Sequence, residues 1–291
     1  MRLAEFNLSE APRKSVSVDR ILDLPPFPPV ARKLMALISQ PNFRIPDVSQ
    51  MVRSDAVFAG EVLRLANSAM MGLRYEVVSV MHAISVLGID RLQSLVVTVA
   101  MRDFLRGGVQ PRLLRLCWRH NLATALLAEA LADACLIERS DGYIAGLLHD
   151  LGRLALVAAF PKEYATAMEC WALGGEQTLR CEERSIGINH REAGLLLADK
   201  WGLPSVLRAV LCMHTTPRPA AFTVVRLISV ACSLAERLGF TISQSKLEWD
   251  RAWLEEQLPP ASWARLAPKV DELREQIPMK INQFECEFLP G

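Results

Sequence analysis

The chain has 291 residues, of which 51% are hydrophobic and 22% are charged; this is the profile of a globular protein and excludes a largely disordered chain. Its formal net charge of +1 provides no general attraction to nucleic acid or to an anionic membrane, so direct binding to either is not expected. The seven cysteines include no CxxC pair, which argues against a disulfide framework or a zinc ribbon and favours reduced thiols in the cytoplasm.

The beginning of the chain predicts a leader followed by a helical lobe. Residues 1–23 are polar and mixed, and we expect a flexible leader with at most a short helix over residues 18–22. The prolines of Leu24-Pro-Pro-Phe-Pro-Pro29 exclude a helix interior and predict an extended segment. The N-terminal lobe is predicted over residues 24–108, with helices at 30–39, 45–53, 56–68, 78–87 and 92–105. Residues 95–99 have strand propensity in isolation, but the helical patterns around them favour a helix.

The string Arg106-Gly-Gly-Val-Gln-Pro111 is the clearest boundary, because two glycines and a proline favour a linker. A second helical lobe is predicted over residues 109–240 and a C-terminal helical extension over residues 241–291. The helices of the second lobe are predicted at 112–135, 143–160 (one or two helices), 162–173, 176–185, 191–201, 206–213 and 222–238. We therefore expect an all-α, two-lobed fold with the C-terminal helices packed back on one of the lobes.

The apolar run of residues 143–160 contains the doublet His149-Asp150, together with Arg153, which argues against a membrane span. Burying an ionised carboxylate is costly unless another group compensates for its lost hydration. A divalent metal ion would compensate, since it binds neutral imidazole and carboxylate together. An internal hydrogen bond between His149 and Asp150, or capping of the next helix by Asp150, would serve equally well.

A second histidine, His120, is predicted to point inward. It shares one face of its helix with mostly apolar residues: Leu113, Leu116, Cys117, Thr124 and Leu127. A lone inward histidine is more often a core residue with a hydrogen-bond partner than a metal ligand. Because the His149-Asp150 doublet follows about one helix-turn-helix later, we predict that His120, His149 and Asp150 converge as metal ligands.

His120 and the His149-Asp150 doublet resemble the first part of the metal-binding motif of the HD superfamily of metal-dependent phosphohydrolases. In that superfamily a first His, a His-Asp doublet and a late Asp hold a divalent metal. Further strings resemble the HDOD family, the HD-related output domain of bacterial signalling. They are Leu24-Pro-x-Phe-Pro28, Leu63-Arg-Leu-Ala-Asn67-Ser68, Ala83-Ile-Ser-Val-Leu87-Gly88, His190-Arg-Glu-Ala-Gly194 and Trp201-Gly-Leu-Pro204. The resemblance covers about residues 20–240 and makes the second lobe HD-like. It implies a regulatory signal-transduction module without HD hydrolase activity.

The chain also departs from the HD pattern. Cys232 aligns with the late Asp, and a thiol is a poor substitute for an oxygen ligand of magnesium or manganese, although it can bind zinc. Arg153 stands where the HD-GYP relatives, which hydrolyse cyclic di-GMP, carry a Lys after the doublet, and no GYP string follows. His190 and His214 resemble the extra histidines of that group, but Thr215 replaces the second His of the pair.

The expected site is therefore degenerate, with no cofactor or a partially occupied divalent metal. His190, His214, Cys232 and Arg153 are candidates for a ligand pocket. The resemblance implies other signalling proteins as partners, or a small-molecule or nucleotide ligand. The alternative is a metal-dependent phosphohydrolase that uses the His-Asp site. A stripe of arginines at 112, 115 and 119 would meet phosphate or an acidic partner, or is simply the solvated side of a helix.

Overall fold

The computed structural model describes residues 11–68, 71–106, 111–169, 176–213, 222–242 and 247–288, and within these ranges it consists of helices without a strand. The first lobe contains α2 (Pro29–Ile38), α3 (Ile45–Arg53), α4 (Ala56–Ala66), α5 (Val80–Leu87) and α6 (Ile89–Arg106). The second contains α7 (Pro111–Cys135), α8 (Arg139–Leu148), α9 (Leu151–Ala159), α10 (Pro161–Glu169), α11 (Glu176–Ile186), α12 (His190–Trp201), α13 (Ser205–Met213) and α14 (Val224–Arg237). The predicted all-α fold is confirmed, and residues 95–99 are helical within α6.

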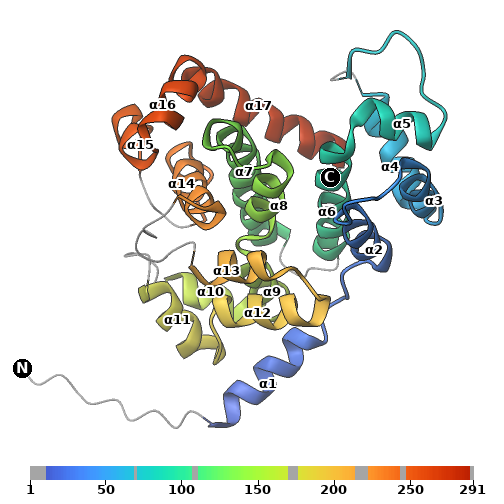
Figure 1. Ribbon diagram of the computed structural model, residues 1–291. Coiled ribbons are helices and arrows are strands. Elements are labelled where there is room, and N and C mark those ends of the chain that lie inside the picture. Colours follow the sequence, from blue (N-terminus) through green and yellow to red (C-terminus); the bar gives the residue numbers. More distant parts are fainter. Residues whose placement is uncertain are drawn as a thin grey trace, which may run out of the picture.

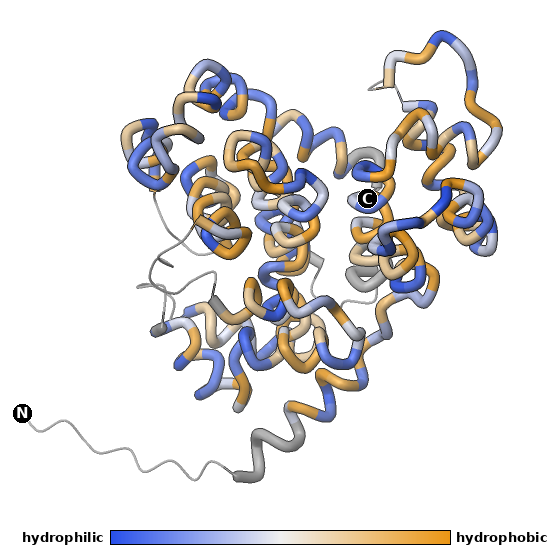
Figure 2. Tube along the Cα trace, viewed as in Figure 1, coloured by the Kyte–Doolittle hydropathy of each residue, from blue (hydrophilic) through white to orange (hydrophobic). Residues whose placement is uncertain are grey.

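The tail forms α15 (Arg251–Gln257), α16 (Pro260–Leu266), a short 3-10 helix (Ala267–Lys269) and α17 (Val270–Phe288). These helices pack against α7 and α14, as Figure 1 shows, so the expectation that they fold back on one lobe is confirmed. Hydrophobic and hydrophilic residues alternate along most helices (Figure 2), which is the pattern of amphipathic helices around a shared interior. Within the described ranges no single helix is long and apolar enough to cross a membrane.

The segment expected to be a flexible leader contains a helix, α1 (Ala11–Leu22), which is longer than the short helix expected over residues 18–22. It packs against α9, α11 and α12 of the second lobe. Ile21 is completely buried there, and the Lys200 ammonium of α12 donates to the carbonyl oxygen of Leu24 at 2.8 Å. Helix α1 therefore lies against the second lobe, and the chain crosses from it to α2 of the first lobe (Figure 1).

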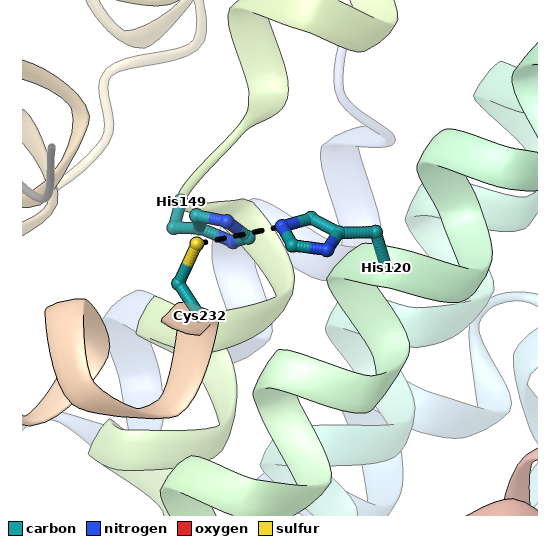
Figure 3. A group of neighbouring side chains, drawn as sticks. All are labelled: His120, His149 and Cys232. Carbon is teal, nitrogen blue, oxygen red and sulfur yellow. Dashed lines mark hydrogen bonds between the residues drawn. The ribbon is translucent and has the colours of Figure 1, made fainter. Parts of the chain in front are cut away.

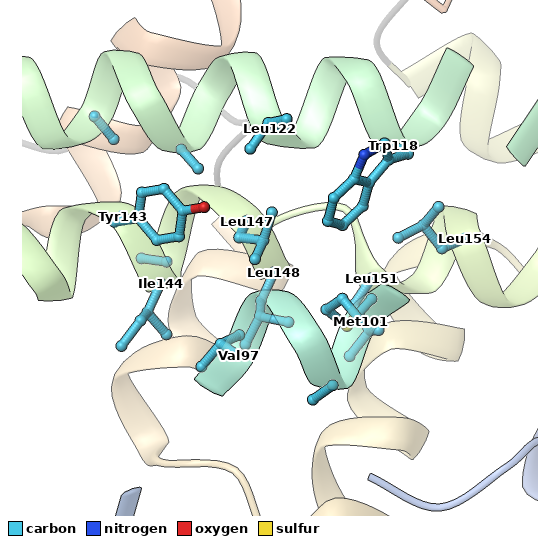
Figure 4. Close-up of a cluster of buried hydrophobic side chains, with 14 of the residues drawn as sticks. Val97, Met101, Trp118, Leu122, Tyr143, Ile144, Leu147, Leu148, Leu151 and Leu154 are labelled. Atoms are coloured by element: carbon cyan, nitrogen blue, oxygen red, sulfur yellow. The ribbon is translucent and has the colours of Figure 1, made fainter. Parts of the chain in front are cut away.

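The two lobes share one core, because α6 packs directly on α8. Val97 and Met101 of α6 extend toward the buried side chains of α7 and α8 in Figure 4. The hydroxyls of Thr98 (α6) and Tyr143 (α8) lie 3.0 Å apart and form a buried hydrogen bond across this contact. The second lobe is thus held in place by the last helix of the first.

The His149-Asp150 doublet lies at the junction between α8 and α9, where the apolar run of residues 143–160 breaks into two helices. The backbone of α8 touches that of α7 at Gly146, where an added Cβ would lie 2.7 Å from the Cα of Ala125. Only glycine permits this approach. The close contact brings the end of α8 beside His120 on α7.

Candidate functional site

His120 is buried and engages α14 and the residues after it through both ring nitrogens. Its Nδ1 lies 2.7 Å from the carbonyl oxygen of Phe240, which follows α14, and its Nε2 lies 3.5 Å from Sγ of Cys232 on α14. A carbonyl oxygen only accepts, so Nδ1 carries the ring proton and Nε2 offers a lone pair. The Cys232 thiol then donates to Nε2, as the dashed line in Figure 3 indicates.

His149 is arranged in the same way at the end of α8. It is 1% exposed, and its Nδ1 lies 2.7 Å from the carbonyl oxygen of Gly146, so its proton is on Nδ1 as well. The ring centroids of His120 and His149 are 5.2 Å apart. One ligand atom from each of His120, His149 and Cys232 can be chosen so that all three lie within 4.8 Å of one another. The structure therefore brings the two histidines together with the cysteine.

Asp150 is not a member of this His-His-Cys group. It is 2% exposed, and its Oδ2 lies 3.1 Å from Nη1 of Arg153, one turn further along α9. Burial by itself lowers the pKa of the Arg153 guanidinium, but Asp150, and after it Tyr164 and Glu182, raise that pKa above its ordinary value. Arg153 therefore remains charged and supplies the positive charge that a metal would supply in an HD site.

His190 belongs to a second buried cluster, centred on Glu182 of α11. The Glu182 carboxylate accepts from Nδ1 and from the backbone N–H of His190, at 2.7 and 2.8 Å, and from the Tyr164 hydroxyl at 3.5 Å. The backbones of α9 and α12 meet beside it, because a Cβ on Gly152 would lie 1.7 Å from the carbonyl oxygen of His190. His214 lies outside the described residues.

The sequence reasoning missed Glu182, although a signal for it exists. On α11 the buried residues follow helical spacing, and Glu182 is among them, with Thr178, Cys181 and Ile186. A carboxylate on the inward face of an amphipathic helix indicates a buried polar partner. Its partners, His190 and Tyr164, come from α12 and α10.

The electrostatics of the His-His-Cys group favour neutral side chains. Burial lowers the pKa of His120, and the negative charge of Asp150 only partly opposes this effect. Burial also raises the pKa of the Cys232 thiol well above its ordinary value, and the carboxylates of Glu236 and Asp150 raise it further. His120 and Cys232 are therefore uncharged at neutral pH when no cation is present.

This donor set does not fit the oxygen-preferring metal of an HD phosphohydrolase. Magnesium and manganese prefer carboxylate, carbonyl and water oxygens, whereas the clustered atoms are imidazole nitrogens and a sulfur. The one carboxylate of the expected set, that of Asp150, is paired with Arg153.

Two arginines of the predicted stripe, Arg115 and Arg119, face the chain's own C-terminal helix. Nε of Arg115 lies 3.2 Å, and Nε of Arg119 3.7 Å, from Oε1 of Glu285 on α17. The Arg119 guanidinium also lies 5.6 Å from the ring centroid of Phe240, whose carbonyl holds His120. The acidic partner considered for this stripe is therefore present within the molecule.

A groove between the lobes is a second candidate site. It lies where α2 and α6 of the first lobe meet α8, α13 and α14 of the second. Met35, Ile144 and Leu207 give it apolar walls, and Gln93 and Asp141 supply polar groups. Such a mixture of apolar walls and few polar groups is typical of ligand sites at lobe interfaces.

The chain matches the HDOD domain over residues 24–217. An uncharacterized protein of Treponema pallidum (strain Nichols) is 28% identical over 204 residues, which make up 68% of this chain. This chain spans 39% of that relative's length.

Two solved structures have the same fold. An HDOD domain protein with unknown function from Geobacter sulfurreducens has a TM-score of 0.70 at 22% identity, with 90% of this chain and 97% of that one covered. A protein of Shewanella amazonensis SB2B, provisionally named a phosphohydrolase, has a TM-score of 0.68 at 21% identity, with 91% and 97% covered. At these identities the likeness shows the fold alone. Since the HDOD match extends over more than half of the sequence, the chain belongs to the HDOD domain family.

Proposed function

We propose that this protein is a regulatory signal-transduction module that acts by binding signalling proteins or a small ligand, and that its HD-like site does not hydrolyse phosphate esters. The observation that carries the proposal is the buried ion pair between Asp150 and Arg153, with a distance of 3.1 Å between Oδ2 and Nη1. A hydrolytic HD site needs its carboxylates to hold a metal that activates water. Here the doublet's carboxylate is already compensated by a guanidinium.

Recruiting Asp150 to a metal would separate this ion pair. Breaking a buried pair costs about 3–5 kcal/mol, because a charged group is left without its counter-ion in a medium of low polarity. The resemblance aligns the second carboxylate of the HD pattern with Cys232, and burial raises the pKa of this thiol and so favours its neutral form. Both features favour a structural role for the doublet over a catalytic one.

The interlobe groove supports the binding half of the proposal. A ligand or peptide in it would contact α2 and α6 on one side and α8 and α13 on the other. Binding there would favour the arrangement of the lobes that makes the better contacts and would shift the population toward it. This gives an HDOD module a physical route from a binding event to an altered surface.

Hydrolysis assays test the enzymatic alternative. Cyclic di-GMP and nucleotide phosphodiesters are incubated with the full chain in magnesium, manganese or ferrous iron, beside an Asp150→Ala variant. We expect no turnover above background and no difference between the two proteins. Metal-dependent turnover that Asp150→Ala abolishes would establish the phosphohydrolase instead.

Affinity purification from the native cell tests the binding role. We expect a defined partner whose recovery falls at least about 10-fold when Asp141 in the groove is changed to Lys, since the substitution reverses a charge at the site. Glu169→Lys is the matched control, because Glu169 is an exposed acid on α10 that does not line the groove. Equal recovery with both variants would exclude the groove as the binding site.

A further inference from the structure

We propose that His120, His149 and Cys232 form a binding site for a thiophilic divalent cation of the zinc type, and that Asp150 lies outside its ligand set. The inference goes beyond the regulatory function and rests on the His-His-Cys group alone. All three side chains come from the second lobe, through α7, the junction after α8, and α14. Figure 3 shows them facing one another.

The spacing of the donor atoms suits a tetrahedral ion. With zinc–nitrogen and zinc–sulfur bonds of about 2.0 and 2.3 Å, a nitrogen and a sulfur ligand lie ~3.5 Å apart. The distance between Nε2 of His120 and Sγ of Cys232 is 3.5 Å, and all three ligand atoms lie within 4.8 Å of one another. Binding therefore requires loss of the thiol proton and a small inward movement of His149, with no rearrangement of helices.

The surroundings of both imidazoles are those of metal-ligating histidines. Such histidines donate their second ring N–H to a carbonyl or carboxylate, which fixes the tautomer and aims the other nitrogen at the ion. His120 does this with the carbonyl of Phe240 and His149 with that of Gly146, each at 2.7 Å. Because Nδ1 of each ring donates to a carbonyl, Nε2 is the nitrogen that each histidine would use to bind an ion.

The chemistry of the set determines which cation it takes. Two imidazoles and a thiolate favour zinc and related ions over magnesium and manganese, which require oxygen. Arg153 holds the Asp150 carboxylate away from the set and so removes the donor that would favour manganese. Water or a small ligand would complete the fourth position.

Cobalt(II) tests the proposal as a spectroscopic substitute for zinc. The full chain is treated with a chelator, and cobalt is added under anaerobic conditions. We expect one equivalent to produce a near-ultraviolet sulfur-to-cobalt charge-transfer band and the strong visible bands of tetrahedral cobalt. Zinc should displace the cobalt, and manganese and magnesium should compete at least about 100-fold less well.

Three variants identify the ligands. Cys232→Ser should lose the charge-transfer band, whereas Cys135→Ser, which changes another half-buried cysteine located on α7, should keep it. Asp150→Asn should also keep the band, although an HD-type site would lose its metal. If Cys232→Ser does not fold, His149→Gln replaces it, and loss of the tetrahedral bands is the expected result.

The proposal is overturned if wild-type protein gives no such band, if Cys232→Ser retains it, or if manganese competes as well as zinc. Loss of cobalt binding in a folded Asp150→Asn variant would equally overturn it. These readouts record binding and not hydrolysis. If no cobalt binds, the proposed regulatory function is unaffected, because the hydrolysis assays and the affinity purification test it separately.

Discussion

Arg153 determines what the doublet at 149–150 can do, because it shares a buried ion pair with Asp150. We predict that Arg153→Met destabilises the protein by about 3–5 kcal/mol, since it leaves a buried carboxylate without its counter-ion. The double variant with Asp150→Asn should recover most of the loss, because removing both charges also removes the mismatch. The free energy of unfolding from urea titrations of all four proteins measures the coupling.

The exposed pair of Arg44 and Asp47 is a control with the same spacing of three residues. Its side chains are 73% and 38% exposed, so Arg44→Met should cost at most about 1 kcal/mol. If Arg153→Met costs no more than Arg44→Met, the ion pair does not compensate the doublet. The main support for a non-catalytic site would then be lost.

The resemblance to the HD superfamily aligns Cys232 with the late Asp of its pattern, and introducing a carboxylate at this position tests that alignment. We predict that Cys232→Asp is less stable than wild type without metal, because the carboxylate is buried beside neutral imidazoles. Manganese should then raise its melting temperature and bind at least about 10-fold more tightly than to wild type, as calorimetry would show. A folded variant that binds manganese no better would mean that Cys232 does not stand at the metal-ligand position.

At the scale of elements, the sequence predicted most helices and the inward face of His120, because helical periodicity records which side of a helix is buried. It did not predict that Asp150 forms an ion pair with Arg153. Asp150 directly precedes α9 and Arg153 lies three residues later in its first turn, a spacing that favours pairing, but only the packed structure shows that the pair is buried. The cluster of Glu182 and His190 depends on the packing of α9 through α12, which periodicity does not specify.

The residue that follows α7 has a strained backbone, which the helical pattern of the sequence does not predict. Leu136 has φ of +57°, in the left-handed region, and the N–H of Ile137 donates back to the carbonyl of Ala132 at 3.0 Å. Glycine is the usual residue at this helix-ending position. We predict that Leu136→Gly stabilises the protein by up to about 1 kcal/mol, since the leucine is 82% exposed and little packing is lost.

Two further variants separate backbone strain from loss of the side chain. Leu136→Asn should stabilise by a smaller amount, because asparagine tolerates the left-handed region, and Leu136→Ala should leave stability nearly unchanged. Urea titration measures all three. If Leu136→Ala and Leu136→Gly have the same effect, the gain comes from removing an exposed leucine and not from relieving strain.

At the scale of the whole molecule, the two lobes form a shared core, although the sequence predicts a boundary between them near residue 108. Helix α6 of the first lobe packs on α8, and the buried hydroxyls of Thr98 and Tyr143 are hydrogen-bonded across the contact. Helix α1 packs on the second lobe although it precedes the first. The buried apolar residues of both lobes form one continuous cluster. Separation of the lobes would therefore expose core surface.

We predict that the lobes unfold together in a single transition, because neither retains a complete core without the other. The sequence offers a direct measurement, since all six tryptophans lie between residues 118 and 263 and none in the first lobe. Tryptophan fluorescence therefore reports on the second lobe and the C-terminal helices, whereas far-ultraviolet circular dichroism reports on every helix. The two signals should give the same urea midpoint and the same slope. A separate transition seen only by circular dichroism would show that the first lobe unfolds independently, and the shared core would then not hold the two lobes in one cooperative unit.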